Sequence, residues 1–226
     1  MTDCQTRYPL LLIHGLNCRD DWIFSYWGRT ADILRAHGAR VFLSGQDAWG
    51  GIPGNAEALL RRSEEILKET GSEKLNFLAH SKGGLEARYL ISTLGFASKT
   101  ASLTTICTPH RGSRAAAEWL GREQACKLAG RGLESFWRAR GDQDPNFLLA
   151  LAALTPESME RFNRENPDST LVYYQSWGAR LDKAGWDIMD RLQLWLTKAD
   201  APTDGLVSPE SAVWGRISPQ GTSPSL

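Results

Sequence analysis

The segment Ala79–Gly83, which reads Ala-His-Ser-Lys-Gly, constrains the fold of this chain more than any other stretch. The largely apolar run Lys74–Leu78 precedes it and is typical of a buried strand, whereas Gly83–Leu90 has the spacing of a helix. A serine at so tight a junction needs small neighbours that tolerate a strained backbone, and its hydroxyl then stands exposed above the sheet. The pattern therefore predicts a nucleophile elbow centred on Ser81, with Ala79 in place of the usual first glycine.

Strand-like and helix-like segments alternate through the first half of the chain. Helical spacing is found in Tyr26–His37, which stops at Gly38, and in a second segment that Asn55 can cap and that ends before Gly71. Alternation at this spacing implies a parallel sheet with right-handed crossovers, in which chemistry collects at the carboxyl ends of the strands. We therefore expect an α/β fold, with strands at Tyr8–Ile13, Arg40–Ser44, Lys74–Leu78 and Ala101–Cys107.

The second half of the chain has a different pattern. Residues 114–168 carry helical patches and little strand pattern, which indicates either a helical lid over a cleft or additional helices packed on one face of the sheet. A strand returns at Thr170–Ser176, and Trp186–Leu196 has helical spacing. Residues 217–226 are rich in proline, serine and glycine, and we expect this tail to be disordered.

Length and composition fit one ordinary globular domain spanning residues 1–226. The 26 basic residues balance the 26 acidic ones, so no overall field favours nucleic acid or an anionic membrane. No apolar stretch approaches the roughly 20 residues of a membrane span, and the start of the chain lacks the pattern of a secretory leader. We expect a cytoplasmic protein, or a secreted one whose leader has been removed. The four cysteines lack metal-like spacing, so no metal or cofactor is expected.

Ser81 is the candidate nucleophile, and a serine hydroxyl needs a base to remove its proton. His14-Gly15-Leu16 ends the first predicted strand, and the glycine lets the backbone turn there. We expect the N–H of Leu16 and the N–H of Lys82 to form an oxyanion hole. His14 itself is interpreted as a structural residue, because it precedes the turn and does not face the serine.

Asp204 is the candidate triad acid. It lies in a turn bordered by Pro202 and Gly205, well after the serine, in the chain order nucleophile, acid, histidine. The alternative is an ordinary turn aspartate, because Asp-Gly is common in turns.

The histidine of such a triad is missing from its usual place. None of the four histidines follows Asp204. His80 adjoins the nucleophile, but the elbow points its side chain away from Ser81. His110, at the end of the neighbouring predicted strand, is either a substitute base or a structural residue of the cleft wall.

Taken together, these motifs resemble bacterial triacylglycerol lipases and carboxylesterases of the α/β-hydrolase fold. The resemblance implies hydrolysis of acyl esters through an acyl-serine intermediate, with Ser81 as nucleophile, Asp204 as acid, and the Leu16 and Lys82 N–H groups as the oxyanion hole. It also implies that the insertion 114–168 is a lid over an acyl-binding cleft. The segments that carry it are Tyr8–Leu16, Tyr26–Arg29, Ala79–Gly84, Thr108–Ser113 and Asp204–Val207.

The chain departs from that family after the segment Ser208–Gly215, where relatives carry a histidine and this chain has none. We therefore keep two hypotheses. The first is a serine ester hydrolase acting on a small-molecule or lipid ester, with transient contact to a lipid surface. The second is a catalytically silent, truncated or frameshifted hydrolase-fold protein that binds lipid or a partner. A base donated by another chain of an oligomer is a third reading.

Overall fold

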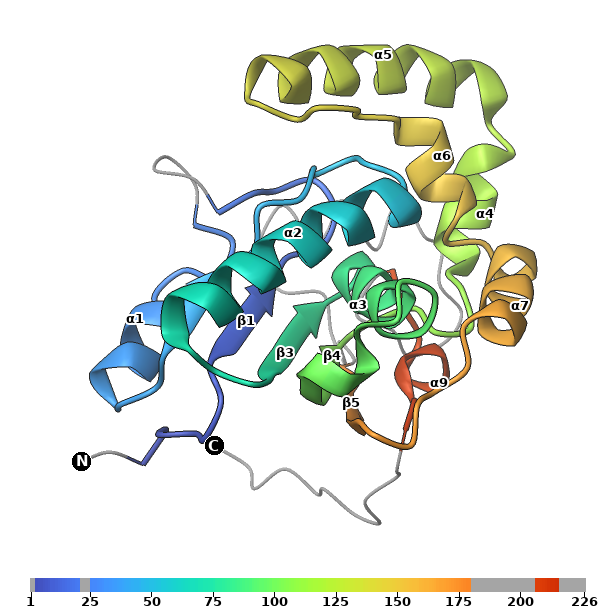
Figure 1. The fold of residues 1–226 in the computed structure, drawn as a ribbon. Coiled ribbons are helices and arrows are strands. Elements are labelled where there is room, and N and C mark those ends of the chain that lie inside the picture. Colours follow the sequence, from blue (N-terminus) through green and yellow to red (C-terminus); the bar gives the residue numbers. More distant parts are fainter. Residues whose placement is uncertain (1–2, 21–24, 180–205, 216–226) are drawn as a thin grey trace.

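A computed structural model describes residues 3–20, 25–179 and 206–215 of the chain. Five parallel strands form one sheet in the order β2-β1-β3-β4-β5, with helices packed against it (Figure 1). This arrangement confirms the expected α/β fold with a parallel sheet. The strands are β1 (Leu10–Ile13), β2 (Val41–Leu43), β3 (Leu75–His80), β4 (Thr100–Ile106) and β5 (Tyr173–Trp177).

The helices of the first half are crossovers between these strands. They are α1 (Thr30–Ala36), α2 (Ile52–Thr70), α3 (Lys82–Ser92) and the short 3-10 helix η1 (Phe96–Lys99). The long helix α2 ends at Gly71, whose positive φ of 65° caps the helix in the left-handed conformation that glycine adopts at no steric cost.

The start of α2 differs from the sequence expectation. Asn55 does not cap the helix, because α2 begins three residues earlier, with Gly51 as N-cap and Pro53 in the first turn. Proline fits there because the first N–H groups of a helix have no partner within the helix. Asn55 is instead buried inside the helix, where its amide reaches Asp47 and Glu86.

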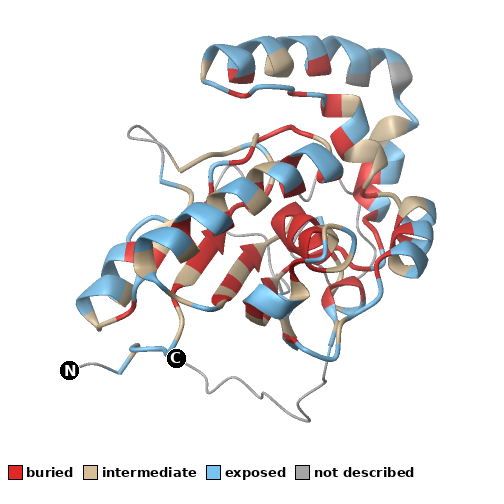
Figure 2. Ribbon diagram, viewed as in Figure 1, coloured by how far each residue is buried: buried red, intermediate tan, exposed pale blue. Residues whose placement is uncertain are grey.

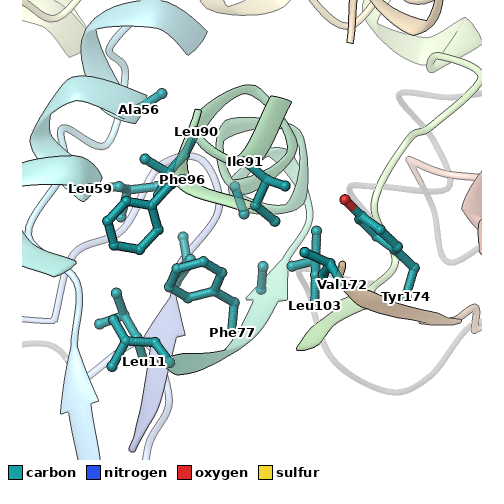
Figure 3. Packing of buried hydrophobic residues seen from close by; sticks show 14 of the residues in the cluster. Leu11, Ala56, Leu59, Phe77, Leu90, Ile91, Phe96, Leu103, Val172 and Tyr174 are labelled. Atoms are coloured by element: carbon teal, nitrogen blue, oxygen red, sulfur yellow. The ribbon is translucent and has the colours of Figure 1, made fainter. Parts of the chain in front are cut away.

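The main core lies between the sheet and helices α2 and α3. Figure 3 shows Leu11 of β1 and Phe77 of β3 packed beneath Leu59 of α2 and Leu90 of α3. The ring of Phe77 also stacks on Phe96 of η1, with 6.3 Å between centroids. Burying each of these side chains contributes about 1.5–3 kcal/mol, so the packing holds the central strands and the elbow helix in one rigid unit.

The described part of the second half is helical, as expected, until the chain returns to β5. Its helices are α4 (Arg114–Leu120), α5 (Glu123–Ala139), α6 (Phe147–Ala152) and α7 (Pro156–Glu165), followed by the short α9 (Pro209–Ala212) after the undescribed segment. Figure 2 shows that α5 presents an exposed outer face, whereas the elbow helix α3 is buried.

Helices α4 to α7 lie beyond the ends of α2 and α3 (Figure 1), where two buried clusters attach them to the sheet domain. In one, Trp137 and Phe147 pack with Trp49 of the loop after β2. In the other, Met159 and Phe162 pack with Leu85 of α3. The insertion therefore packs on the loop after β2 and on the elbow helix α3.

Three sequence expectations lie outside the described residues: the acid Asp204, the helix at Trp186–Leu196, and the tail 217–226. Within the ranges that the structure describes, no helix combines the length and apolar character needed to cross a membrane.

Candidate active site

Ser81 occupies the junction between β3, which ends at His80, and α3, which begins at Lys82. Its backbone has φ 53° and ψ −129°, a conformation that residues other than glycine rarely adopt. Holding a residue in such a conformation costs about 1–3 kcal/mol of free energy, and the surrounding contacts must offset this cost. The strained turn has the form expected of a nucleophile elbow.

Three hydrogen bonds hold the elbow in place. The Ser81 N–H donates to the carbonyl of Ile106 in β4, at 2.8 Å. The Ser81 carbonyl accepts from the Thr108 hydroxyl at 2.8 Å and from the Gly84 N–H at 3.1 Å. The N–H of Ser81 is therefore bonded to β4, and its carbonyl is bonded to the loop after β4 and to helix α3.

The glycines after Lys82 let α3 begin very close to the strand ends. A methyl group on Gly83 would lie 2.3 Å from the carbonyl oxygen of His14, and one on Gly84 would lie 2.2 Å from the hydroxyl oxygen of Thr108. Either contact is far inside van der Waals distance. The Gly83-Gly84 pair thus lets the elbow helix pack directly against the ends of β1 and β4.

The loop after β1 lies against the nucleophile. A methyl group on Gly15 would lie 2.8 Å from Cβ of Ser81 and 3.2 Å from the carbonyl oxygen of His80. Leu16 follows directly, while Lys82 opens helix α3, whose first N–H groups have no acceptor within their own helix. The structure therefore places Gly15, the residue before Leu16, against Ser81, and the oxyanion hole of Leu16 and Lys82 stays a prediction.

The side chain of Lys82 points into the protein and not into the site. Its ammonium group pairs with the carboxylate of Glu86 one turn later, and both side chains are almost fully buried. Burial raises the pKa of the Glu86 carboxyl, and the Lys82 charge opposes that shift. The second Glu86 oxygen accepts from Gln46 at 3.2 Å, and Asn55 donates to the first at 2.7 Å.

Gln46 extends this buried cluster to the end of β1. Its side-chain amide donates to the backbone carbonyl of His14 at 3.1 Å, while the backbone carbonyl oxygen of Gln46 lies 3.2 Å from Nε2 of His14. Nδ1 of His14 lies 2.9 Å from the carbonyl of Gly15. Burial lowers the pKa of His14 to about 4, so this ring is neutral near pH 7. A continuous polar cluster thus links the elbow helix to the backbone that leads into Leu16.

All four histidines lie within described ranges, and hydrogen bonds hold each of them to other groups. His14 has the structural setting expected from the sequence. His37 is half-exposed at the end of α1. The side-chain and carbonyl partners are Gly15 and Gln46 for His14, Asp3 for His37, Tyr26 for His80, and Thr105 and Arg88 for His110.

His110 follows β4, as expected, but its ring is buried. The Arg88 guanidinium donates to Nδ1 at 3.4 Å, so Nε2 carries the proton and donates to the Thr105 hydroxyl at 3.0 Å. The ring stacks on Trp214 with 5.1 Å between centroids. Burial and the charge of Arg88 hold the pKa of His110 well below its usual value. These contacts favour the structural alternative for His110 over the substitute base.

Asp204 lies outside the described residues, but part of the chain after it is described. The Ser113 hydroxyl donates to the carbonyl of Leu206 at 2.7 Å, and the Ser211 hydroxyl donates to the carbonyl of Gly112 at 2.7 Å. The segment 206–215 is therefore attached to the loop after β4.

A separate hollow of about 520 Å³ lies beside β5 and does not include Ser81. It is lined by Arg111, Asp168, Ser169, Thr170, Val172, Tyr174, Val213, Trp214 and Gly215.

Two features of the site were missed from the sequence. The buried pair Lys82–Glu86 has the (i, i+4) spacing of a helical ion pair, which was a usable signal, although only packing shows that the pair is buried. Tyr26, which the sequence indicated only as part of a motif, has its hydroxyl near Gly15 and hydrogen-bonded to Nδ1 of His80.

Among the described residues, no cluster of three or more histidine, cysteine or acidic side chains is placed to hold a metal ion.

Comparison with curated proteins finds triacylglycerol lipases. The chain is 33% identical to one from Vibrio cholerae, over 94% of this chain and 76% of that protein. It is 34% identical to lipases from Pseudarthrobacter phenanthrenivorans and Burkholderia plantarii, in each case over 75% of this chain. These two matches span only 57% and 51% of the relatives' lengths, so the chain corresponds to little more than half of either protein. No family model matches the sequence.

Solved structures show the same fold at low sequence identity. The metagenomic carboxyl esterase MGS0156 superposes with a TM-score of 0.73 at 20% identity, covering 92% of this chain and 60% of that chain. The mature form of the Bacillus licheniformis lipase BlEst2 gives a TM-score of 0.62 at 18% identity, covering 93% of this chain and 80% of that chain. Both are lipase or esterase structures, which agrees with the α/β-hydrolase fold expected from the motifs.

Proposed function

The chain belongs to the triacylglycerol lipase family, and on that basis we propose that it hydrolyses carboxylic esters of lipids with Ser81 as the nucleophile. The observation that carries the proposal is the strained Ser81 turn at the end of β3, against which the loop after β1 is packed. A hydroxyl held in this way at the carboxyl end of a parallel sheet is accessible to a substrate that enters from above.

The proposed reaction has two halves. The Ser81 oxygen attacks the ester carbonyl carbon while a base takes the hydroxyl proton, and the N–H groups of Leu16 and Lys82 bind the oxyanion. The alcohol leaves with that proton, and water then hydrolyses the acyl-serine by the same steps in reverse order. Asp204 is proposed as the acid that supports the protonated base.

A lipid ester is the substrate class that the exposed surface favours. Leu128 and Phe136 of α5 and Leu149 of α6 are large apolar side chains with 77%, 51% and 50% of their surface exposed. They lie on the helical insertion, which packs on the loop after β2 and on α3, and where the sequence predicts a lid. We propose that residues 114–168 form this lid and that its apolar side chains make transient contact with a lipid surface.

The second candidate function is a silent hydrolase-fold protein that binds lipid or a partner. The engagement of all four histidine rings by other groups favours it. Loss of the triad base lowers the kcat of serine hydrolases by up to about 10⁶-fold, although binding and the oxyanion hole leave a residual rate.

Labelling by a serine-directed fluorophosphonate, read beside turnover of p-nitrophenyl butyrate and a long-chain triacylglycerol emulsion, separates the two functions. We expect labelling and turnover to disappear in Ser81→Ala and to remain in Ser98→Ala, a control at an exposed serine of η1. An intact chain without labelling and without turnover would exclude the hydrolase and leave the binding protein. Faster turnover of the emulsion than of the soluble ester would support the lipid substrate.

A further inference from the structure

Helix α5 carries apolar side chains on its outer side as well as on the side that packs on the protein. Leu133 and Trp137 of the inner side belong to a buried cluster with Phe147. Leu128 and Phe136 are instead exposed to solvent, on the outer side of α5 that Figure 2 shows in pale blue. At 3.6 residues per turn, Leu128 lies roughly 140–180° around the helix axis from Leu133 and Trp137. Packing within the described part of the chain therefore does not account for Leu128.

The ring of Phe136 is held at the border between the two sides. It meets the buried ring of Trp137 edge-on, with 5.3 Å between centroids, and the Arg140 guanidinium lies 5.8 Å from its centre. Solvent nevertheless reaches about half of the Phe136 surface, since its exposed fraction is 51%. An aromatic side chain fixed in this way loses little conformational entropy when it binds something else.

A row of basic side chains borders these exposed apolar ones. Lys127, Arg131 and Arg138 are all exposed, and their spacing places them within roughly 40° of one another around the helix axis. Glu134 is the one carboxylate among the α5 side chains that the structure describes. It accepts the N–H of Phe147 at 2.8 Å, so it faces α6. The chain as a whole has 26 basic and 26 acidic residues, and the positive charge of this row is therefore a local feature.

We propose that the outer face of α5, formed by Lys127, Leu128, Arg131, Phe136 and Arg138, binds an anionic lipid surface. The apolar side chains enter the acyl region, and the basic ones lie against the lipid phosphates. This inference deepens the proposed function and rests on it, because a lipid-ester hydrolase meets its substrate at such a surface. It adds that the charge of the surface, and not its apolar character alone, decides where the protein binds.

Two other occupants fit the outer face of α5 less well. A second copy of the chain in a two-fold dimer would bring the basic row against itself, and like charges oppose that contact. A soluble polyanion would pair with Arg131 and Arg138 but would offer nothing to Leu128. An anionic lipid surface satisfies both kinds of side chain at once.

The test is co-sedimentation of the full chain with vesicles, in the Ser81→Ala background so that no lipid is hydrolysed. One vesicle is phosphatidylcholine alone, and the other is phosphatidylcholine and phosphatidylglycerol in equal parts. Arg131→Gln/Arg138→Gln removes two charges seven positions apart on α5. Arg61→Gln/Lys68→Gln is the matched control, because these exposed residues have the same spacing on α2. Circular dichroism and Tm establish that each variant is folded.

We expect the vesicles that contain phosphatidylglycerol to bind about 100-fold more tightly than the neutral ones, since each basic side chain near an anionic surface contributes a factor of about 5. Arg131→Gln/Arg138→Gln should bind them about 20-fold more weakly, whereas the α2 control should bind as the parent does. Raising the salt from about 0.1 M to about 1 M should weaken binding steeply, because the screening length falls from about 10 Å to about 3 Å.

The apolar part of the proposal has its own variant. Leu128→Ala should bind the anionic vesicles about 10-fold more weakly, because it removes carbon atoms that would enter the acyl region. Leu171→Ala is the control, at a leucine outside the insertion with 60% of its surface exposed. Unchanged binding in Leu128→Ala would overturn the proposal and assign the outer face of α5 to a soluble polyanion. A chain that is dimeric by analytical ultracentrifugation and becomes monomeric in Leu128→Ala would overturn it in favour of a second copy.

The remaining outcomes separate this proposal from the proposed function. Equal binding to both vesicles, or binding that Arg131→Gln/Arg138→Gln leaves unchanged, would overturn the anionic surface alone. So would a wild type that turns over p-nitrophenyl butyrate but binds neither vesicle. Charge-dependent binding by a folded wild type that a fluorophosphonate does not label and that turns over no ester would overturn the hydrolase and leave the lipid surface.

Discussion

The carboxylate of Glu86 is paired with the ammonium group of Lys82 inside the first turns of the elbow helix, and both side chains are removed from solvent. Gln46 and Asn55 complete the hydrogen bonds of the carboxylate. The residue directly after the nucleophile is therefore part of the core. Its backbone N–H, at the start of α3, has no acceptor within its own helix.

Removing one partner of this pair should destabilise the protein strongly. Glu86→Ala leaves the Lys82 charge buried without a counter-ion, and we expect a loss of about 3–5 kcal/mol in the free energy of unfolding. Urea unfolding at pH 7 measures it. Glu65→Ala breaks the exposed pair with Arg62 and should change stability by less than about 0.5 kcal/mol. A Glu86→Ala variant as stable as that control would contradict the buried pair.

Close packing at the elbow should make Gly83 intolerant of any side chain. Gly83→Ala places a methyl group against the fixed carbonyl of His14, and we expect a loss of about 1–3 kcal/mol as well as slower labelling of Ser81. Gly132→Ala in α5 is the matched control, because a methyl group there meets nothing within 4 Å. That change should stabilise the helix by about 0.5–1 kcal/mol, and Tm measurements on both variants test the pair.

The buried His14 predicts a loss of stability in mild acid. Its pKa is about 4 when folded and near 6.5 when unfolded, so its contribution is complete above pH 6.5 and is lost as the pH falls towards 4. The whole contribution is roughly 3 kcal/mol. We expect urea unfolding at pH 7, 6 and 5 to give a steeper decline for the wild type than for His14→Gln. His37→Gln, at a half-exposed ring, should retain the wild-type slope. Equal slopes in the wild type and both variants would exclude protonation of His14 as the cause of the loss of stability in acid.

Asp142 should control the attachment of the helical insertion. Its buried carboxylate accepts from the N–H groups of Ala48 and Trp49, each at 3.1 Å, and from Arg19 at 2.8 Å. Asp142→Ala leaves these donors without an acceptor, and we expect a cost of about 1–3 kcal/mol. Hydrogen exchange should become faster in α5 and α6 than in α2. Uniform acceleration across the chain would instead indicate that the insertion does not open separately.

Local patterns were sufficient to predict most of the fold. Apolar runs located all five described strands, and a serine flanked by small residues located the elbow, because these features depend on neighbours in sequence. The start of α2 was predicted wrongly. An asparagine is a good cap by propensity, but Asn55 has a tertiary partner in Glu86 that overrides this preference.

The candidate site depended more heavily on contacts between distant segments. No spacing rule connects Tyr26 with His80, 54 positions later, or Gln46 with both His14 and Glu86. For the same reason the sequence could not choose between a base and a structural residue at His110, since the choice depends on Arg88 and Trp214 packing around its ring.

Sequence alone thus determined the α/β class, the order of the elements, and Ser81 as the strained residue, because strand and helix periodicity and small side chains are properties of adjacent positions. Tertiary structure alone decided which histidine rings are enclosed, which charge is buried beside the nucleophile, and which phenol approaches Gly15. Burial and hydrogen bonding arise only when strands and loops far apart in the chain meet at one edge of the sheet, and these determine the protonation and orientation of each group.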